Sequence, residues 1–418
     1  MKDKKIIVVG GGASGLMAAI GAAQTAKENK ENIKVTICER MNRVGKKILA
    51  TGNGRCNYTN RNVSPKHYFG EHPAFTKPAL EFFDLDAAIN FFLRMGVFPK
   101  EEAEGRMYPY SEQASSVLDC LRFETEKLGI EVKTGFDVKE VKNNGEEFSV
   151  TSYKGETLTG DRVVLACGGC ASPDLGSNGS GFKILEGLGH TVSEVSPALV
   201  QLKLKGDFLK ALSGIRFKGC VGLCVNNHTI REEKGEILFT DYGISGIAVF
   251  QPSGYLRDAG RSKVYVNIDF MPEYETTEIF GLLGMRAADL SHLTMENFFT
   301  GLLNKRIGNV IAKKSGIEKL SFPVSKLDKN MLWSLAYNIK FFKAEILGTN
   351  GWNNAQVTAG GAVTKQFYSA TLESKRVPGL YCCGEIFDIY GECGGYNLQW
   401  AWSSGYMAGA SAAGSLIC

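Results

Sequence analysis

The sequence predicts an α/β protein in which a discontinuous Rossmann-like domain carries an inserted antiparallel β domain and a small helical domain. Two observations carry this prediction. A β-branched apolar segment at residues 6–9 leads directly into a glycine-rich turn and an alanine-rich helical pattern. A further strand that suits the same sheet comes only near residue 380, after a long stretch with different patterning. The domain that opens the chain is therefore completed far along it.

The first turn carries a dinucleotide-binding fingerprint. Gly10, Gly12 and Gly15 have G-x-G-x-x-G spacing between a strand and a helix. The first glycine makes the tight turn, the second admits a pyrophosphate to the backbone, and the third lets the helix pack on the strand. Ala13 and Ser14 open that helix, where free N–H groups and the helix dipole favour an anion. The pattern predicts a pyrophosphate site here.

The second strand, "IKVTICE", places an acid at its end. Glu39 lies 24 residues beyond Gly15. A carboxylate at that position accepts hydrogen bonds from both hydroxyls of an adenosine ribose, and it disfavours a 2′-phosphate. We expect Glu39 and the adjacent Arg40 to contact the cofactor. The alternative is a surface ion pair of Glu39 with Arg40 or Arg43.

The patterning after this domain divides the chain. The alternating or β-branched segments "ALVQLKL", "CVGLCVN", "EILFT" and "VYVNIDF" predict an antiparallel sheet or barrel. Apolar residues at helical spacing then follow. We expect three regions. A Rossmann-like cofactor-binding domain comprises residues 1–195 and 347–418, an inserted antiparallel β domain comprises residues 196–272 with 338–346, and a helical subdomain comprises residues 273–337. The cleft between the inserted regions and the cofactor is the expected substrate site.

Composition narrows the function. The chain has 418 residues, a formal net charge of +4 and 49 glycines. That charge suits a small anionic ligand but falls far short of a nucleic-acid-binding surface. The sequence starts without a signal peptide and contains no membrane-spanning run, and eleven cysteines in irregular settings do not suggest a secreted disulfide framework. We expect a cytoplasmic protein with a small-molecule substrate, without nucleic-acid or membrane partners, and leave its oligomeric state open.

The glycines favour a flavin over a nicotinamide cofactor. They gather at 10–15, 45–54, 168–181, 360–361 and 391–395. Clustered glycine indicates sharp turns or a close approach of backbone to a ligand. Only one G-x-G-x-x-G follows a strand, so the chain has one dinucleotide site surrounded by several further clusters. A large cofactor such as FAD accounts for them together, whereas unrelated turns are the alternative.

The segment "VGKKILATGNGRCNYTN" resembles a signature of a family of bacterial FAD-dependent oxidoreductases. This family includes aminoacetone oxidases and reductases of bile-acid dehydroxylation, and its cofactor domain resembles that of fumarate reductase and succinate dehydrogenase flavoproteins. The segments "VVLACGG", "PDLGSNGSGFKILEGLGH", "VPGLYCCGE" and "GECGGYNLQWAWSSGYMAG" resemble its other cofactor elements. The likeness covers nearly the whole chain.

This resemblance implies a set of FAD contacts. The glycine-rich stretch after Glu39 would lie along the pyrophosphate and ring, the later segments would close over the flavin, and a helix N-terminus near residue 396 would face its pyrimidine end, where a dipole stabilises negative charge. The residues so assigned are Gly45, Lys46, Thr51, Gly52, Asn53, Gly54, Cys56, Asn57, Cys167, Gly168, Gly169, Gly384, Glu385, Gly394, Gly395, Tyr396, Asn397 and Leu398.

No catalytic residue stands out in the sequence. Arg106 with Tyr108, and Tyr242, lie in segments expected to face the flavin and are candidates for an acid or base, although shaping the pocket is the other interpretation. Cys167 and Cys170 have the C-x-x-C spacing of a redox pair, but no matching second pair suggests a metal, and we expect none. His190 follows a glycine-ended helix and is expected to be structural.

The expected activity is that of an FAD-dependent oxidoreductase. Within the family, we favour a reductase of an activated C=C bond in a small apolar, steroid-like substrate, because the inserted regions are rich in Phe, Leu and Ile. NAD(P)H binding transiently over the flavin, or an electron-donor protein, would supply the electrons. An aminoacetone-type amine oxidase that uses oxygen is the alternative, and a flavin-bound redox-sensing protein is the alternative from another class.

Overall fold

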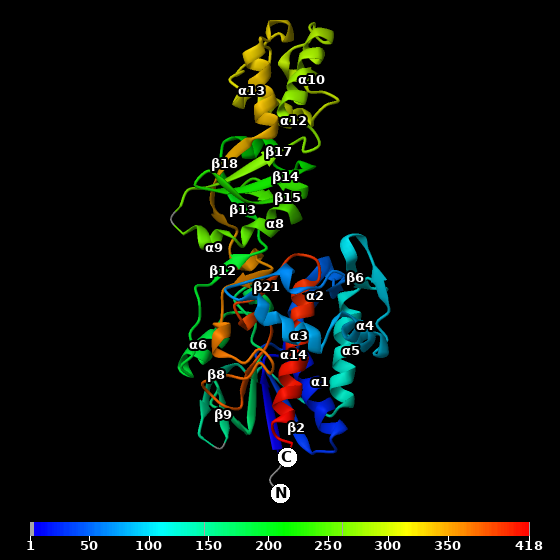
Figure 1. The fold of residues 1–418 in the computed structure, drawn as a ribbon, viewed down its shortest axis with the longest axis vertical. Coiled ribbons are helices and arrows are strands. Elements are labelled where there is room, and N and C mark those ends of the chain that lie inside the picture. The colour runs from blue at the N-terminus through cyan, green and yellow to red at the C-terminus, as the bar shows by residue number, and fades with distance from the viewer. Residues whose placement is uncertain (1–3, 146, 261, 418) are drawn as a thin grey trace. The chain divides into compact units, whose positions relative to one another are not determined.

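The computed structural model describes residues 4–145, 147–260 and 262–417 (Figure 1). The chain divides into two compact units. One comprises the residues up to Pro197 together with those from Ala355 onward, and the other comprises Ala198–Asn354. The first unit is thus made from two separate stretches of chain.

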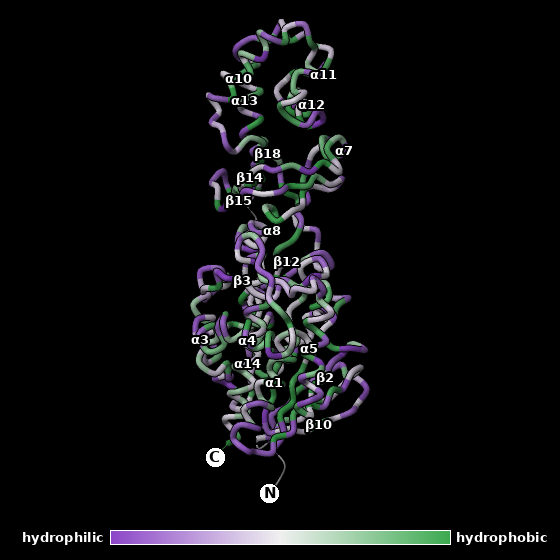
Figure 2. Tube along the Cα trace, turned by 90° about the vertical axis from the view of Figure 1, so that its right-hand side faces the viewer, coloured by the Kyte–Doolittle hydropathy of each residue, from purple (hydrophilic) through white to green (hydrophobic). Residues whose placement is uncertain are grey.

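A five-stranded parallel sheet is the centre of the first unit. Its strand order is β20-β11-β1-β2-β7, and each neighbouring pair runs parallel. The strands β1, β2, β11 and β20 are largely buried, as expected for a sheet covered on both faces, whereas the edge strand β7 is partly exposed. They are β1 (Lys4–Val9), β2 (Ile33–Glu39), β7 (Glu131–Thr134), β11 (Arg162–Leu165) and β20 (Leu380–Cys382). Figure 2 shows hydrophobic residues concentrated along β2.

Two helices from opposite ends of the sequence pack tightly against each other beside this sheet (Figure 1). They are α1 (Ala13–Glu28) and α14 (Tyr396–Gly414). A Cβ on Gly409 would lie 1.8 Å from the carbonyl oxygen of Ala18, and one on Gly405 would lie 2.4 Å from that of Ser14. Glycine at these positions lets the two backbones approach closely, so α14 completes the cofactor domain.

The remaining elements of the first unit surround the sheet. An antiparallel meander covers part of it, three short strands form a small sheet, and further helices pack outside. The bounds are β8 (Val138–Asn143), β9 (Phe148–Ser152), β10 (Thr157–Gly160), β3 (Thr59–Asn60), β5 (Pro99–Glu101), β6 (Arg106–Pro109), α2 (Lys46–Ala50), α3 (Lys77–Phe82), α4 (Leu85–Arg94), α5 (Ala114–Lys127) and α6 (Ser180–Gly187). Two short pairs join distant segments: β4 (Tyr68–Phe69) with β21 (Tyr390–Gly391), and β12 (Ser196–Ala198) with β19 (Val357–Ala359).

The second unit contains a closed antiparallel barrel. Its strands follow the order β13-β16-β15-β14-β17-β18. Asn226 and Asn227 both have positive φ between β14 and β15, which is the backbone of a tight hairpin turn. The strands are β13 (Leu202–Lys205), β14 (Arg216–Val225), β15 (His228–Phe239), β16 (Gly243–Ser245), β17 (Val264–Asp269) and β18 (Phe342–Thr349).

The helices of this unit share one hydrophobic core with the barrel. Leu283, Ile311 and Leu335 from three helices belong to the same buried cluster as Val266 and Phe342 from the strands. The helices are α7 (Phe208–Leu212), α8 (Ile247–Ser253), α9 (Leu256–Ala259), α10 (Thr276–Asp289), α11 (Met295–Phe298), α12 (Lys305–Lys314) and α13 (Lys329–Lys340).

The predicted fold class is confirmed: a Rossmann-type parallel sheet is accompanied by antiparallel sheets and helices. In the described part of the chain, none of the helices combines the length and apolar character that crossing a bilayer requires. The ten cysteines in the described ranges are free thiols.

Candidate functional site

The three glycines of the first turn differ in what surrounds them. A Cβ on Gly15 would lie 1.8 Å from the carbonyl oxygen of Gly10, and one on Gly10 would lie 2.5 Å from that of Ala166. Both positions are closed by the protein's own backbone. A Cβ on Gly12, the residue before α1, would meet nothing within 4 Å, and no side chain caps the helix. The open position therefore lies where a pyrophosphate would approach.

Glu39 is buried at the end of β2 and holds the turn in place. Its Oε2 accepts a hydrogen bond of 2.7 Å from the N–H of Gly11, and its Oε1 accepts one of 2.7 Å from the N–H of Met41. The adjacent Arg40 pairs with Asp137 at 3.6 Å and donates to the carbonyl of Gly176. A carboxylate can accept about four hydrogen bonds, so Glu39 keeps acceptor capacity for a ribose.

The residues that follow Glu39 turn sharply beside the glycine turn and lead into α2. Gly45 has a φ of +70° and its N–H donates to the carbonyl of Gly11, which ties α2 to the first turn. Lys46 and Lys47 begin α2. The Nζ of Lys47 lies 2.8 Å from Oε2 of Glu385, which follows β20. Sequence reasoning assigned Lys46 to this region and missed Lys47.

The loop of residues 52–56 has an unusual backbone. Gly52, Asn53, Gly54 and Cys56 all have positive φ, between +56° and +83°. Such a run of left-handed residues is costly for Asn and Cys and concentrates at functional sites. A Cβ on Gly54 would meet nothing within 4 Å. Thr51 stabilises the start of the loop by donating its hydroxyl to the carbonyl of Ile48.

Side chains of this loop contact the protein itself. Arg55 pairs with Glu102 at 2.8 Å, and its guanidinium lies over the ring of Tyr108, 4.2 Å from the ring centre. Cys56 is fully buried, and this burial raises the pKa of its thiol to about 12. The Oδ1 atom of Asn57 is buried and, among the described residues, lacks a hydrogen-bond partner. That acceptor can take a hydrogen bond from a ligand.

The turn after β11 meets the segment that follows β20. A Cβ on Gly169 would lie 2.3 Å from Oγ1 of Thr358, whose N–H donates to Oε1 of Glu385 at 2.9 Å. Gly168 has a φ of +70°. Glu385 therefore contacts both Lys47 and the residue that packs on this turn, and three separate segments of the chain converge on one carboxylate.

The surroundings of the two thiols beside this turn disfavour the thiolate form. Burial, reinforced by the charge of Glu39, raises the pKa of Cys167 to about 12, and burial followed by the charge of Glu385 raises the pKa of Cys170. Thiolate is the nucleophilic form of cysteine. The C-x-x-C pair therefore packs as small side chains. In the described ranges, no group of three His, Cys, Asp or Glu residues is placed to hold a metal.

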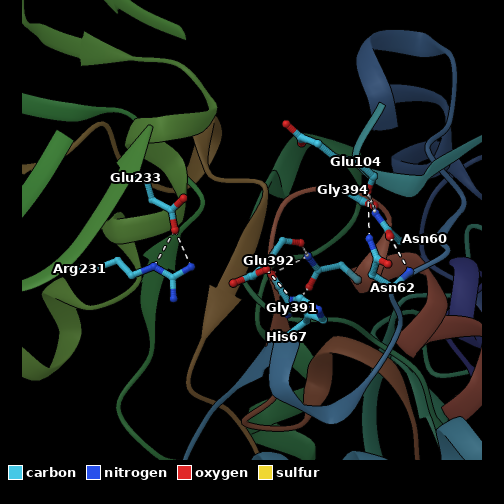
Figure 3. Close-up of polar contacts among 10 residues, drawn as sticks. Asn60, Asn62, His67, Glu104, Arg231, Glu233, Gly391, Glu392 and Gly394 are labelled. Atoms are coloured by element: carbon cyan, nitrogen blue, oxygen red, sulfur yellow. Dashed lines mark hydrogen bonds and ion pairs between the residues drawn. The ribbon is translucent and has the colours of Figure 1, made fainter. Parts of the chain in front are cut away.

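The N-terminus of α14 lies at another edge of the site. Gly394 and Gly395 precede it with φ of +122° and +101°, and a Cβ on Gly395 would lie 2.3 Å from the carbonyl oxygen of Thr59. Asn60 donates to the carbonyl of Gly394 at 2.8 Å (Figure 3). The helix has neither an acidic residue in its first turn nor a side-chain cap. Its first N–H groups therefore suit a partial negative charge.

The first turn of α14 is fixed from within. The side-chain Oδ1 of Asn397 accepts from the N–H of Gly391 at 2.7 Å, and its Nδ2 donates to the carbonyl of Gly391 at 2.9 Å. Asn397 thus closes the loop before the helix. Leu398 packs against the core. Gly384, with a φ of +75°, accepts at its carbonyl from the indole N–H of Trp400.

A hydrogen-bonded pair of one histidine and one glutamate, which the sequence did not predict, lies against this helix. Nδ1 of His67 is 2.8 Å from Oε2 of Glu392, and the His67 ring stacks on Tyr396 at 4.5 Å between centres. Figure 3 shows His67 and Glu392 side by side. The two residues are 325 positions apart in sequence. No local motif links them, so only the fold could reveal the pair.

The other catalytic candidates are placed differently. Arg106 pairs with Glu104 beside Asn60, whereas Tyr108 lies beneath Arg55. Tyr242 belongs to the second unit, where its carbonyl accepts from the N–H of Leu204. His190 is buried: its Nε2 bonds to Ser374 and its ring stacks on Phe367. His190 therefore has the structural role expected of it.

The residues at this site fit a flavin dinucleotide. A cradle lies open at Gly12 before an uncapped helix, a buried acid stands at the ribose position, and an orphaned acceptor, Asn57, lies beside the glycines of a second uncapped helix. Backbone donors and small residues at both ends match a long anionic cofactor with an electron-rich ring. Fold and site define an oxidoreductase with a flavoprotein-type Rossmann domain.

The chain belongs to the family described by the HI0933-like protein Rossmann domain, which matches residues 4–411. It is 40% identical over 411 residues to a 3-dehydro-bile acid delta(4,6)-reductase of Clostridium scindens, covering 98% of this chain and 99% of the relative. It is 31% identical to a ribosomal RNA dihydrouridine synthase of Haemophilus influenzae over 97% of each chain.

A solved structure supports the fold. The 3-ketosteroid delta1-dehydrogenase of Sterolibacterium denitrificans, in complex with 1,4-androstadiene-3,17-dione, superimposes with a TM-score of 0.51 at 13% identity, covering 99% of this chain and 100% of the other. At that identity the likeness concerns the fold alone. Together with the family match, it agrees with the resemblance that the sequence motifs indicated.

Proposed function

We propose that this protein is an FAD-dependent reductase of a C=C bond conjugated to a carbonyl group, acting on a small apolar, steroid-like substrate. The observation that carries the proposal is the 40% identity, over nearly the full length of both chains, to a reductase named for bile-acid double bonds. A ketone at the 3-position of a steroid is conjugated to a 4,5 double bond, so the alkene accepts hydride at its β carbon.

The second relative points to the same bond chemistry. Formation of dihydrouridine saturates the 5,6 double bond of uracil, which is conjugated to the 4-carbonyl group. Two relatives with unrelated substrates thus have names that describe saturation of an activated alkene. Both relatives therefore support the reaction type that we propose, whereas only the first supports a steroid-like substrate.

The chain's residues have separate tasks in binding. Glu39 would accept the ribose hydroxyls, and the open backbone at Gly12 with the N-terminus of α1 would hold the pyrophosphate. Glu385 with Lys47 would lie along the linker between pyrophosphate and ring, and the α14 N-terminus would stabilise negative charge on the ring. When bound, FAD supplies the two-electron chemistry, passing hydride to a carbon.

We further propose NAD(P)H as the electron donor. The experiment is anaerobic mixing of the purified flavoprotein with NADH, NADPH or aminoacetone, followed by flavin absorbance. We expect bleaching by one of the nicotinamides, and then reoxidation by 4-androstene-3,17-dione but not by the saturated 5α-androstane-3,17-dione. Bleaching by aminoacetone alone would instead establish the amine oxidase. A protein that purifies and reconstitutes without flavin would contradict the whole proposal.

Uridine reduction in ribosomal RNA is a second candidate. Two relatives with that name are 31% and 30% identical over 97% and 96% of this chain. Residues 198–354 also carry twenty Lys and Arg against fifteen Asp and Glu, so the inserted unit holds the positive excess. Mass spectrometry of ribosomal RNA incubated with the reduced protein decides between the candidates. Dihydrouridine formation would overturn both the steroid assignment and the expectation of no nucleic-acid partner.

A further inference from the structure

We infer that His67, oriented by Glu392, is the proton donor to the substrate carbon next to the carbonyl group. This inference rests on the proposed function. Reduction of a conjugated alkene needs a hydride at the β carbon and a proton at the α carbon, and a positioned acid must deliver that proton. The imidazole of His67, which lies beside the first residue of α14, can take this task.

The geometry fixes the chemistry of the imidazole. A carboxylate only accepts hydrogen bonds, so Nδ1 of His67 carries a proton toward Oε2 of Glu392, 2.8 Å away. The second nitrogen, Nε2, is then the atom that gains and loses a proton. A histidine whose one nitrogen is held by a carboxylate while the other faces a reactant is a recurring acid–base arrangement.

The second nitrogen of the His67 ring lacks a partner among the residues that the structure describes. Nε2 of His67 is buried and, in the described part of the chain, makes no hydrogen bond. Leaving a buried polar atom unpaired carries a desolvation cost, so such an atom calls for an explanation. A ligand that accepts or donates a proton at this position would provide its partner.

Several contacts hold the ring in one orientation. The backbone carbonyl of His67 accepts a hydrogen bond from the N–H of Glu392 at 3.0 Å. The strands that adjoin these two residues, β4 and β21, pair with each other. The ring stacks on Tyr396 at an interplanar angle of 24°. Asn397 donates to the carbonyl of Glu392 at 3.1 Å. Glu392 is therefore a positioning residue that is itself anchored to the N-terminus of α14, where the flavin ring is expected.

The neighbouring groups are weaker donors. Arg106 lies nearby but its guanidinium does not release a proton in proteins, and it is already paired with Glu104. Burial raises the pKa of Tyr396 to about 12, which makes its hydroxyl a poorer acid. Tyr108 lies under Arg55, and His190 is bonded to Ser374. His67 is the imidazole beside the α14 end of the site.

The proposed step is balanced. Hydride from the reduced cofactor forms a C–H bond at the β carbon, and the alkene electrons shift toward the carbonyl. The Nε2–H bond of protonated His67 breaks as a C–H bond forms at the α carbon. The cofactor is oxidised by two electrons, the substrate is reduced by two, and neutral His67 regains a proton from solvent.

The test compares two acceptors on the same reduced flavoprotein. Dithionite-reduced wild type, His67→Gln, Glu392→Gln and the control His72→Gln are mixed with 4-androstene-3,17-dione or with ferricyanide. Ferricyanide takes electrons without needing a proton on carbon. We expect His67→Gln to slow reoxidation by the enone about 100- to 10,000-fold, with the ferricyanide rate unchanged. Glu392→Gln should give a smaller loss and an altered pH profile, and His72→Gln neither.

A second measurement is independent of turnover. With five histidines in the chain, 15N NMR of the cofactor-free protein can be assigned by the signal lost in His67→Gln. We expect the neutral ring to carry its proton on Nδ1. A ring protonated on Nε2 when neutral would overturn the inference, as would an unchanged enone rate or equal slowing with both acceptors. If the reduced wild type reacts with ferricyanide but not with the enone, the result contradicts the proposed function, and with it the role of His67 in that reaction.

Discussion

The carboxylate of Glu39 accepts hydrogen bonds from the backbone N–H groups of Gly11 and Met41, each at 2.7 Å. The acid at the end of β2 therefore shapes the glycine turn before any cofactor arrives. It joins the fingerprint to the strand that follows it in the sheet. The acid that the sequence predicts to bind a ribose thus has a role in shaping the turn, which the sequence did not predict.

The first prediction concerns this acid. In Glu39→Gln, one oxygen becomes an NH2 group that faces a backbone donor, and the charge is lost. Hydrogen bonds to a charged acceptor contribute about 1.5–3 kcal/mol. We therefore expect FAD affinity to fall about ten- to a hundredfold and the unfolding midpoint of the cofactor-free protein to fall as well.

Flavin fluorescence on titration and thermal unfolding measure these two effects. The control is Glu131→Gln on neighbouring β7, where the carboxylate pairs with Lys34 near the surface. That pair is worth about 0–1 kcal/mol, and FAD affinity should not change. Unaltered FAD affinity in Glu39→Gln would remove this acid from the binding site.

The second prediction separates packing from ligand contact within one motif. Gly15→Ala places a Cβ 1.8 Å from the carbonyl oxygen of Gly10 and should destabilise the fold by about 1–3 kcal/mol or more, as overpacking does. Gly12→Ala meets no atom within 4 Å and has an ordinary φ of −80°. The Gly12 variant should fold normally and lose FAD affinity. Thermal unfolding with and without FAD measures both. Equal destabilisation of the two cofactor-free variants would contradict the open cradle.

The third prediction tests the ion pair of Lys47 with Glu385. Both side chains are largely buried, at 25% and 20% exposure. Removing one partner leaves a poorly solvated charge, so Lys47→Met should cost about 1–2 kcal/mol, between the values for exposed and fully buried pairs. The double variant Lys47→Met/Glu385→Gln should recover part of this loss.

Urea unfolding of the single and double variants gives the coupling energy. Lys46→Met, one residue earlier in α2, serves as the control and should change stability by less than about 0.5 kcal/mol. A control as damaging as Lys47→Met would mean that α2, rather than the ion pair, is being disturbed.

The fourth prediction is a pH dependence. Burial lowers the pKa of His190 below its ordinary value of 6.5. Above that value the ring is neutral in both the folded and the unfolded state. As the pH falls below 6.5, the unfolded state binds the proton first, so stability decreases until the folded-state pKa is passed. Each unit of pKa difference contributes about 1.4 kcal/mol.

Urea unfolding across this pH range measures the slope. His190→Phe should flatten it, since Phe can stack on Phe367 but cannot titrate. His228→Gln, at an exposed position, should leave the slope as in wild type. Retention of the full slope in His190→Phe would assign the titration to another group.

The extent to which the sequence predicts this molecule follows from how local each signal is. Gly10, Gly12 and Gly15 lie close together in the chain, so their spacing alone indicates the strand, turn and helix. Glu39 follows from the length of one βα unit. The choice between Lys46 and Lys47 depends on the direction of side chains in a five-residue helix. Periodicity is too short there to decide it.

Contacts between distant segments could not be predicted. His67 meets Glu392 only because β4 pairs with β21 and because Asn397 closes the preceding loop. Likewise, Glu385 meets Thr358 and Lys47 through the order of strands in the sheet. No sequence motif indicates these contacts, because the residues adjacent to each partner in the chain form no recognisable pattern.

The close packing of α14 on α1 has a consequence for biosynthesis. The ribosome makes the first four strands of the parallel sheet, and then the whole barrel, before it makes β20 and α14. The inserted unit has its own core and can fold as it emerges. The surface of α1 that packs against Gly405 and Gly409 stays uncovered until α14 has been synthesised. Under the proposed function, the flavin would therefore bind only at a late stage of synthesis.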